Sequence, residues 1–169
     1  DLLVMTTHSK KGSQKVHIGN TALNYLKITS IPTLVFSCRC NVNSPDKIFN
    51  PTTFSSYSME ASMIGVSLAS HFDAELTTYH IGEKDPGAAK RRINRLAEKE
   101  DVEFNLEVNK GACGKRVLSE STDFDFIVAS RGRGGLLYKL RFLFPKFSLS
   151  SLEKELIAGC DIPYLMVGD

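Results

Sequence analysis

The residues best suited to chemistry lie in one stretch, residues 125–135, where an apolar segment opens into a run of glycines and arginines. Residues 126–128 are continuously apolar, as in a strand that is buried on both faces. The glycines allow positive φ and a close approach of backbone N–H groups, and the arginines carry the fork-shaped cation that binds phosphate. The stretch is typical of a turn that cradles a phosphate, although a basic turn that only closes a strand explains it equally well. These loop residues are Arg131, Gly132, Arg133, Gly134 and Gly135.

Alternating strand and helix patterns determine where this turn would lie. Short apolar or alternating segments predict further strands at 47–52, 74–81, 102–108 and 163–167, and apolar residues at three- and four-residue spacing predict helices at 55–71, 86–100 and 111–121. This alternation predicts right-handed βαβ units and an open, five-stranded parallel sheet with helices on both faces. Ligands of such sheets bind at the carboxyl ends of the strands, so the loops after Pro51, His80 and Val128 should meet there.

Two local details refine this prediction. Ser55 or Ser56 is the candidate N-cap of the first helix, because a serine hydroxyl can accept a hydrogen bond from a free backbone N–H in the first turn. Residues 102–108 alternate strictly between apolar and polar, which indicates a strand with one wet side near an edge of the sheet. Pro51 lies at the end of its strand, where a missing N–H does least harm.

An internal repeat is also visible in the chain. Residues 1–12 echo residues 125–135, and residues 30–36 echo residues 161–167. Helix-compatible residues lie between the two landmarks of each copy, so each copy has the order strand, loop, helix, strand. The second copy carries a longer segment between its two strands.

Composition and charge restrict the classes of function. The protein has 169 residues, of which 42% are hydrophobic and 24% charged, as expected of one soluble domain or of one domain with a piece of another. A formal net charge of +2 is too small for general nucleic-acid binding, so we expect no nucleic-acid partner. No apolar run could span a bilayer and the first residues lack the basic-then-apolar order of a signal peptide, so we expect no membrane association and a cytoplasmic chain, or the cytoplasmic part of something larger.

The cysteines and histidines form no recognisable metal site. The four cysteines match no zinc spacing, and reduced thiols are expected in an intracellular chain. Cys38 and Cys40 flank one arginine and are the pair that could chelate a metal or form a strained disulfide. The four histidines are scattered, without an acid or a cysteine at metal-ligand spacing. We therefore predict no metal site and assign no catalytic residue.

In its alternating strands and helices, its repeated segments and its glycine-rich loop, the chain resembles the universal stress protein family over nearly its whole length. The resemblance implies an adenine-nucleotide alpha-hydrolase-like, Rossmann-like fold, and it makes the chain similar to the C-terminal part of a tandem member. It also implies pairing through the terminal strands, within the chain or across a homodimer. The implied units are the last strand, helix and strand of one repeat at 1–37, a linker at 38–46 and a complete domain at 47–169.

The resemblance extends to a nucleotide site, with departures. Nucleotide-binding members hold phosphates with a Gly, two residues, Gly, nine residues, Gly-Ser/Thr pattern and hold ribose with an Asp after the first strand. Here Thr53 replaces the Asp, Ala129 replaces the first glycine, and Ser150 follows Gly132 after a longer interval. A Cβ at position 129 is expected to strain the turn and to occupy space that a phosphate requires. Ile81 stands where the family has an apolar residue against adenine. The implied degenerate site consists of Pro51, Thr53, Ile81, Ala129, Arg131, Gly132, Arg133 and Ser150.

An insertion at 136–148 interleaves aromatic and basic residues, and Pro145 stops any helix there. The favoured interpretation is a hydrophobic flap that packs over the loop and fills the space of a nucleotide. A surface segment that contacts a protein partner or an anionic membrane is the alternative.

Two functions from different classes follow. The first is a regulatory or stress-related module with a degenerate site for ATP, AMP or another adenine nucleotide, which requires no cofactor and signals by dimerisation or protein interaction. The second is a structural or regulatory domain of a larger protein, such as a transporter, that binds no small ligand, and Thr53 favours it. Neither is an enzyme. Slow nucleotide hydrolysis is a weaker third hypothesis, because no candidate base lies near the loop.

Overall fold

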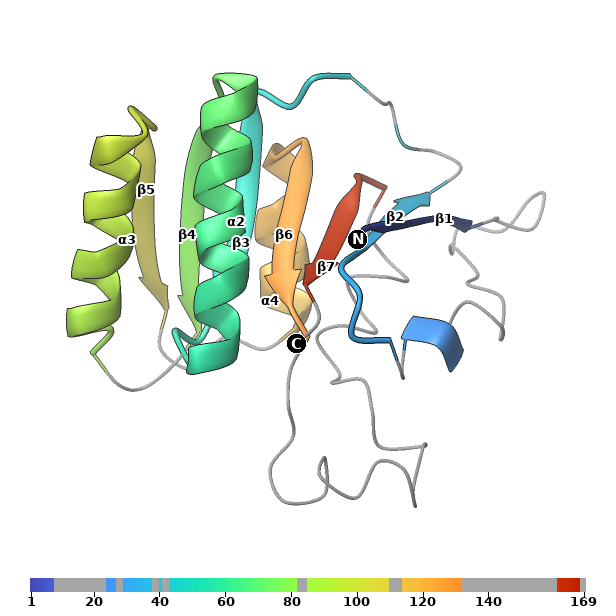
Figure 1. The fold of residues 1–169 in the computed structure, drawn as a ribbon, viewed down its shortest axis with the longest axis horizontal. Coiled ribbons are helices and arrows are strands. Elements are labelled where there is room, and N and C mark those ends of the chain that lie inside the picture. The colour runs from blue at the N-terminus through green and yellow to red at the C-terminus, as the bar shows by residue number, and fades with distance from the viewer. Residues whose placement is uncertain are drawn as a thin grey trace, which may run out of the picture.

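The structure is a computed structural model, and it describes residues 1–7, 24–26, 29–37, 40, 43–81, 85–109, 114–131 and 161–167. The strands are β1 (Leu3–Thr7), β2 (Thr33–Ser37), β3 (Lys47–Thr52), β4 (Glu75–Ile81), β5 (Phe104–Asn109), β6 (Phe126–Ser130) and β7 (Tyr164–Val167). Within the described residues they form one seven-stranded sheet in the order β1-β2-β7-β6-β3-β4-β5 (Figure 1).

The five strands from β3 onward are parallel to one another, which confirms the predicted open parallel sheet. β5 forms one edge, as its alternating sequence predicts, and its burial alternates along most of its length. Val108 on this edge strand is 51% exposed. Alternating burial means that one face of β5 is exposed to solvent, and such a strand is typical of the edge of a sheet.

β1 and β2 form a second parallel pair that joins the other edge of this sheet. The junction is antiparallel, with Thr33 opposite Met166 and Val35 opposite Tyr164. The two repeated strands at 30–36 and 161–167 therefore meet within the chain, which confirms the expected pairing. Thr33 and Met166 are both fully buried, so the junction is part of the core.

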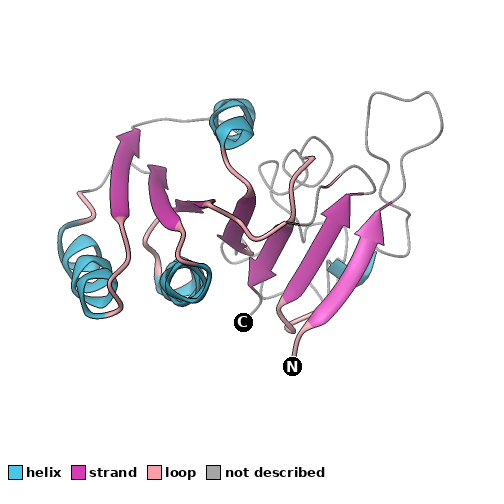
Figure 2. Ribbon diagram, turned by 90° about the horizontal axis from the view of Figure 1, so that it is seen from above, coloured by secondary structure: helices cyan, strands magenta, loops and turns pink. Residues whose placement is uncertain are grey.

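The helices cover both faces of the sheet. The described helices are α2 (Ser56–Phe72), α3 (Gly87–Lys99) and α4 (Gly114–Glu120), followed by a 3-10 turn at Ser121–Asp123. Figure 2 shows α2 and α3 on one face and α4 on the opposite face. Ser55 caps α2 by accepting a hydrogen bond from the N–H of Ser58, which confirms the first of the two predicted caps.

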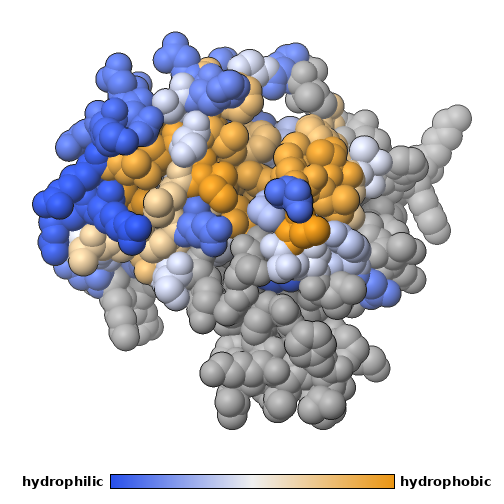
Figure 3. Space-filling model, in the orientation of Figure 1, coloured by the Kyte–Doolittle hydropathy of each residue, from blue (hydrophilic) through white to orange (hydrophobic). Residues whose placement is uncertain are grey.

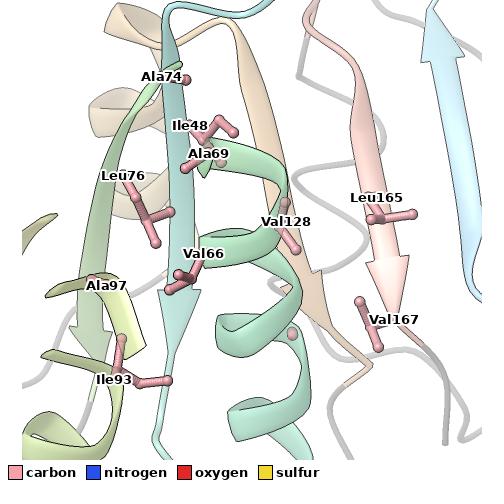
Figure 4. Packing of buried hydrophobic residues seen from close by; sticks show 11 residues of the cluster. Ile48, Val66, Ala69, Ala74, Leu76, Ile93, Ala97, Val128, Leu165 and Val167 are labelled. Atoms are coloured by element: carbon pink, nitrogen blue, oxygen red, sulfur yellow. The ribbon is translucent and has the colours of Figure 1, made fainter. Parts of the chain in front are cut away.

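Two apolar clusters flank the sheet. The first contains Phe49, Ile127 and Met166 and includes Val117 of α4. The second lies under α2 and α3, and Figure 4 shows how its side chains come from both helices and from the strands beneath them. Gly65 of α2 lies close to the sheet, since a Cβ added there would be 3.4 Å from Leu76 Cδ1. Because successive strand residues point to opposite faces, neighbours such as Ile127 and Val128 belong to different clusters.

Candidate functional site

The strand order reverses between β3 and β6. From β3 the sheet extends through β4 to β5 on one side, and through β6 to β7 on the other. In open α/β sheets, ligands bind beside the carboxyl ends of the strands at such a switch point. β3, β4 and β6 are parallel and end at Thr52, Ile81 and Ser130, so the structure brings together the three strand ends that the sequence assigned to the site.

A buried amide joins the three central strands just before this edge. The β3–β6 ladder pairs Ile48 with Phe126 and Phe49 with Ile127. One residue later, Asn50 Nδ2 donates to the carbonyl oxygen of Val128 at 2.7 Å, and Asn50 Oδ1 accepts from Thr78 Oγ1 at 3.4 Å. The Asn50 side chain thus joins β3 to β6 just beyond the last backbone pair of these two strands.

Pro51 follows Asn50 and is buried in β3, opposite Tyr79 of β4. The β3–β6 ladder ends at Phe49, so the lack of an N–H at Pro51 removes no hydrogen bond from that ladder. Sequence analysis placed Pro51 at the end of its strand, and the structure confirms this, since β3 continues by only one residue to Thr52.

The turn between β3 and α2 contains backbone strain. Phe54 has φ of 52°, in the left-handed region that bulky residues rarely adopt. Its N–H donates to Thr52 Oγ1 at 3.0 Å, and its ring stacks on His80 with centroids 5.3 Å apart. These two contacts stabilise a conformation that costs about 1–2 kcal/mol for a residue with a Cβ.

Hydroxyl groups gather around this turn. Thr53 Oγ1 lies 3.3 Å from Ser55 Oγ and 3.4 Å from Ser58 Oγ, and the two serine oxygens are 3.2 Å apart. Ser62 Oγ donates to the Ser58 carbonyl at 3.1 Å and lies 3.5 Å from Thr52 Oγ1. We call these five residues the hydroxyl cluster. Thr53 and Ser55 are exposed, whereas the other three are buried.

His80 and Ile81 close the β4 side of the site. His80 is 2% exposed and lies opposite Thr52 in the β3–β4 register. Ile81 is half-buried and packs against the cluster that contains Phe49 and Tyr79. The apolar residue that the resemblance assigned to adenine is therefore at the expected strand end, and it also takes part in the core.

On the β6 side, Ala129 does not carry the strain expected of it. It lies in β6 with its side chain in the core, 4% exposed. Among the described non-glycine residues, positive φ occurs at Phe54, Asp73 and Asp101. Ala129 is extended because it pairs with Met166 in the β6–β7 ladder. In the described part of the site, a positive φ occurs instead at Phe54.

Arg131 follows β6 and is 2% exposed. Its N–H donates to the Val167 carbonyl at 2.9 Å, and its Nη1 donates to the Thr29 carbonyl. The guanidinium therefore contacts the segment that leads to β2. The remaining predicted site residues, Gly132, Arg133 and Ser150, lie outside the described residues, as does the insertion at 136–148.

Sequence reasoning missed five participants, namely Asn50, Thr52, Phe54, Ser58 and Ser62. The spacing of the serines, one helical turn apart on α2, is the signal that could have indicated them. In the described part of the chain, no group of three or more metal-binding side chains is present. None of the helices there combines the length and the hydrophobicity that crossing a bilayer requires.

Several solved structures with the same fold are universal stress proteins. One from Archaeoglobus fulgidus DSM 4304 superposes with a TM-score of 0.76 at 18% identity and covers 99% of this chain. A putative universal stress protein from Pseudomonas aeruginosa UCBPP-PA14 gives 0.66 at 11% identity and covers 98%. A universal stress protein solved in complex with cAMP gives 0.57 at 15% identity and covers 75% of this chain and 98% of its own. The chain therefore has the universal stress protein fold.

The chain spans 62% of the length of each of the first two structures. No protein-family model matches the sequence. No curated protein matches it either.

Proposed function

We propose that this chain is a regulatory, universal-stress-protein-like module of the stress response with a degenerate adenine-nucleotide site, and that it acts through association of repeats or with a protein partner. The observation that carries the proposal is the hydroxyl cluster. It occupies the end of β3, where the resemblance places the carboxylate that holds ribose.

Thr53 offers a ribose less than an Asp would. A carboxylate accepts hydrogen bonds at two oxygens, so it can bind both hydroxyls of a ribose with charge-assisted bonds. Thr53 has one oxygen, which already lies within hydrogen-bond distance of Ser55 and Ser58. A ribose would have to displace these internal partners, and this competition favours weak binding.

Arg131 supports the same conclusion for the phosphate. Its side chain is buried and donates to the Thr29 carbonyl oxygen, so an incoming phosphate would compete with this hydrogen bond. Ordered hydrogen bonds to a charged donor contribute about 1.5–3 kcal/mol, which such a ligand would have to replace.

The association part of the proposal rests on the antiparallel β2–β7 pair. A terminal apolar strand with an open edge recruits another strand, and here the partner strand comes from 1–37. The division into 1–37, 38–46 and 47–169 is part of the proposal. The cAMP-bound structure covers 75% of the chain, close to the share of residues 47–169, whereas the longer structures cover nearly all of it.

Thermal denaturation with MgATP, ADP and cAMP tests the nucleotide site. A ligand at 100 times its Kd would add about 2.7 kcal/mol to the free energy of unfolding, so binding is readily detected. We expect a weak rise of the melting temperature at millimolar nucleotide, and we expect Gly132→Val to abolish it. Complete silence towards all three ligands would favour the second hypothesis, a domain without a small ligand.

Nucleotide that co-purifies with the wild-type protein, released by acid after gentle isolation, would contradict a degenerate site. Micromolar affinity for any of the three nucleotides would contradict it as well. In that case the hydroxyl cluster would be a binding surface rather than a substitute for the carboxylate.

A further inference from the structure

A groove runs between α2 and α3, on the side of the sheet that these two helices cover. It consists of two hollows of about 510 and 480 Å³ that share Met63, Arg92 and Leu96 among their lining residues. Figure 3 shows this face, with apolar surface between the hydrophilic outer side of α3 and the rest of the molecule. The two hollows adjoin at these three shared residues, and we refer to them together as the groove.

The floor of the groove is apolar and adaptable. Met59, Met63 and Ile64 of α2 and Leu96 of α3 are half-buried, and all four pack against the cluster under these helices. On α2 the lining residues extend from Ser56 to Ser67, about 17 Å along the helix axis. Methionine side chains fit irregular partners, since they are unbranched and polarizable. The floor thus matches about three turns of an apolar helix face.

The wall of the groove on α3 is basic. Arg91, Arg92, Arg95 and Lys99 line it, and all four are exposed. Glu60 is the one acidic residue among the described lining residues. Within the described part of the chain, the only ion pair joins Lys99 Nζ to Glu100 Oε1 at 3.2 Å. The three arginine charges therefore face solvent without a neutralising carboxylate among the described residues.

We propose that this groove binds an acidic amphipathic helix of a protein partner. An apolar stripe of such a helix would cover the methionines and Leu96, and carboxylates beside the stripe would meet the arginines, whose planar fork suits bidentate pairing. The groove begins beside the hydroxyl cluster, since Ser56 lines it and follows Ser55, but none of the five cluster residues is among the lining residues. The proposal rests on this lining and not on the proposed nucleotide site.

Charge and shape favour this occupant over other anions. A flat anionic membrane would contact the exposed basic side chains more readily than the half-buried apolar floor. A nucleic-acid backbone has phosphates for the arginines but offers no apolar stripe for the floor. A helix with one apolar and one acidic face satisfies both parts of the groove.

The test uses a fluorescein-labelled peptide of Glu and Leu in which all leucines lie on one helical face. Fluorescence anisotropy with the full chain should show binding that weakens as salt is added. Arg92→Glu should raise the Kd about tenfold, because Arg92 lines both hollows. Lys90→Glu makes the same charge change on the exposed side of α3, outside the lining residues, and should change the Kd less than about twofold.

Three outcomes would overturn the proposal. One is equal binding of a scrambled peptide with leucines all round the helix, and another is an equal effect of the two charge reversals. The third is binding of phosphatidylglycerol vesicles or of single-stranded polyadenylate that Arg92→Glu abolishes while the peptide does not bind. Unchanged melting temperatures of both variants establish that the fold is intact, as expected for exposed positions.

Discussion

Arg131 Nη1 donates a hydrogen bond to the carbonyl oxygen of Thr29, 102 residues earlier in the chain. Both residues are buried, and the Thr29 N–H donates to the carbonyl oxygen of Tyr25 at 3.0 Å. The end of β6 is thereby tied to the segment that leads to β2. An arginine whose sequence context suggests a phosphate ligand thus links two parts of the sheet.

Arg131→Met should lower the free energy of unfolding by about 1.5–3 kcal/mol, the usual contribution of a hydrogen bond to a charged group. The loss should appear as faster hydrogen exchange in β1 and β2, measured by mass spectrometry. Arg131→Lys should not restore protection, because an ammonium lacks the planar fork. Unchanged exchange together with a loss of phosphate affinity would instead show that Arg131 is a ligand.

Met166→Lys should break the β2–β7 junction. Met166 is fully buried opposite Thr33, so a lysine would place an unpaired charge in the core and cost about 3–5 kcal/mol, measured by denaturant unfolding. Leu2→Lys serves as the control, because Leu2 is 57% exposed, and it should change stability by less than about 0.5 kcal/mol. Equal stability of the two variants would refute a role for this junction.

Asn50→Leu should destabilise the sheet by about 1–3 kcal/mol, because it leaves the buried Val128 carbonyl without its 2.7 Å donor. Thr78→Val removes only the longer 3.4 Å contact to the same amide and should cost less than about 1 kcal/mol. Chemical denaturation of both variants gives the comparison. If Thr78→Val proved the more damaging change, the amide would not be what joins β3 to β6.

Thr53→Asp should strengthen nucleotide binding. It restores a carboxylate at the end of β3, and the added charge lies close to the N-terminus of α2, which favours it. We expect the Kd for MgATP to fall about tenfold, measured by isothermal titration calorimetry, whereas Thr53→Val should not improve it. Identical affinities of the two variants would mean that no ribose lies beside this residue.

The sequence by itself determined the local elements of this protein. β3 covers the predicted residues 47–52, and β5 is the edge strand that its alternation indicates. Ser55 caps α2 as predicted. These features follow from periodicity and capping chemistry, which depend on residues only a few positions apart. The echo between 30–36 and 161–167 also indicated, through the resemblance, which two terminal strands would meet.

Only the tertiary structure decided how the residues at the switch point are used. Phe54 is held at positive φ by its stacking on His80, a residue of the next strand, which no local pattern announces. Arg131 reaches Thr29 only because β7 pairs with both β6 and β2 and so holds these two strands on either side of it. Likewise, the groove between α2 and α3 exists because both helices pack on the same face of the sheet. Contacts of this kind depend on the register and packing of distant segments, whereas propensity acts within a few residues of the chain.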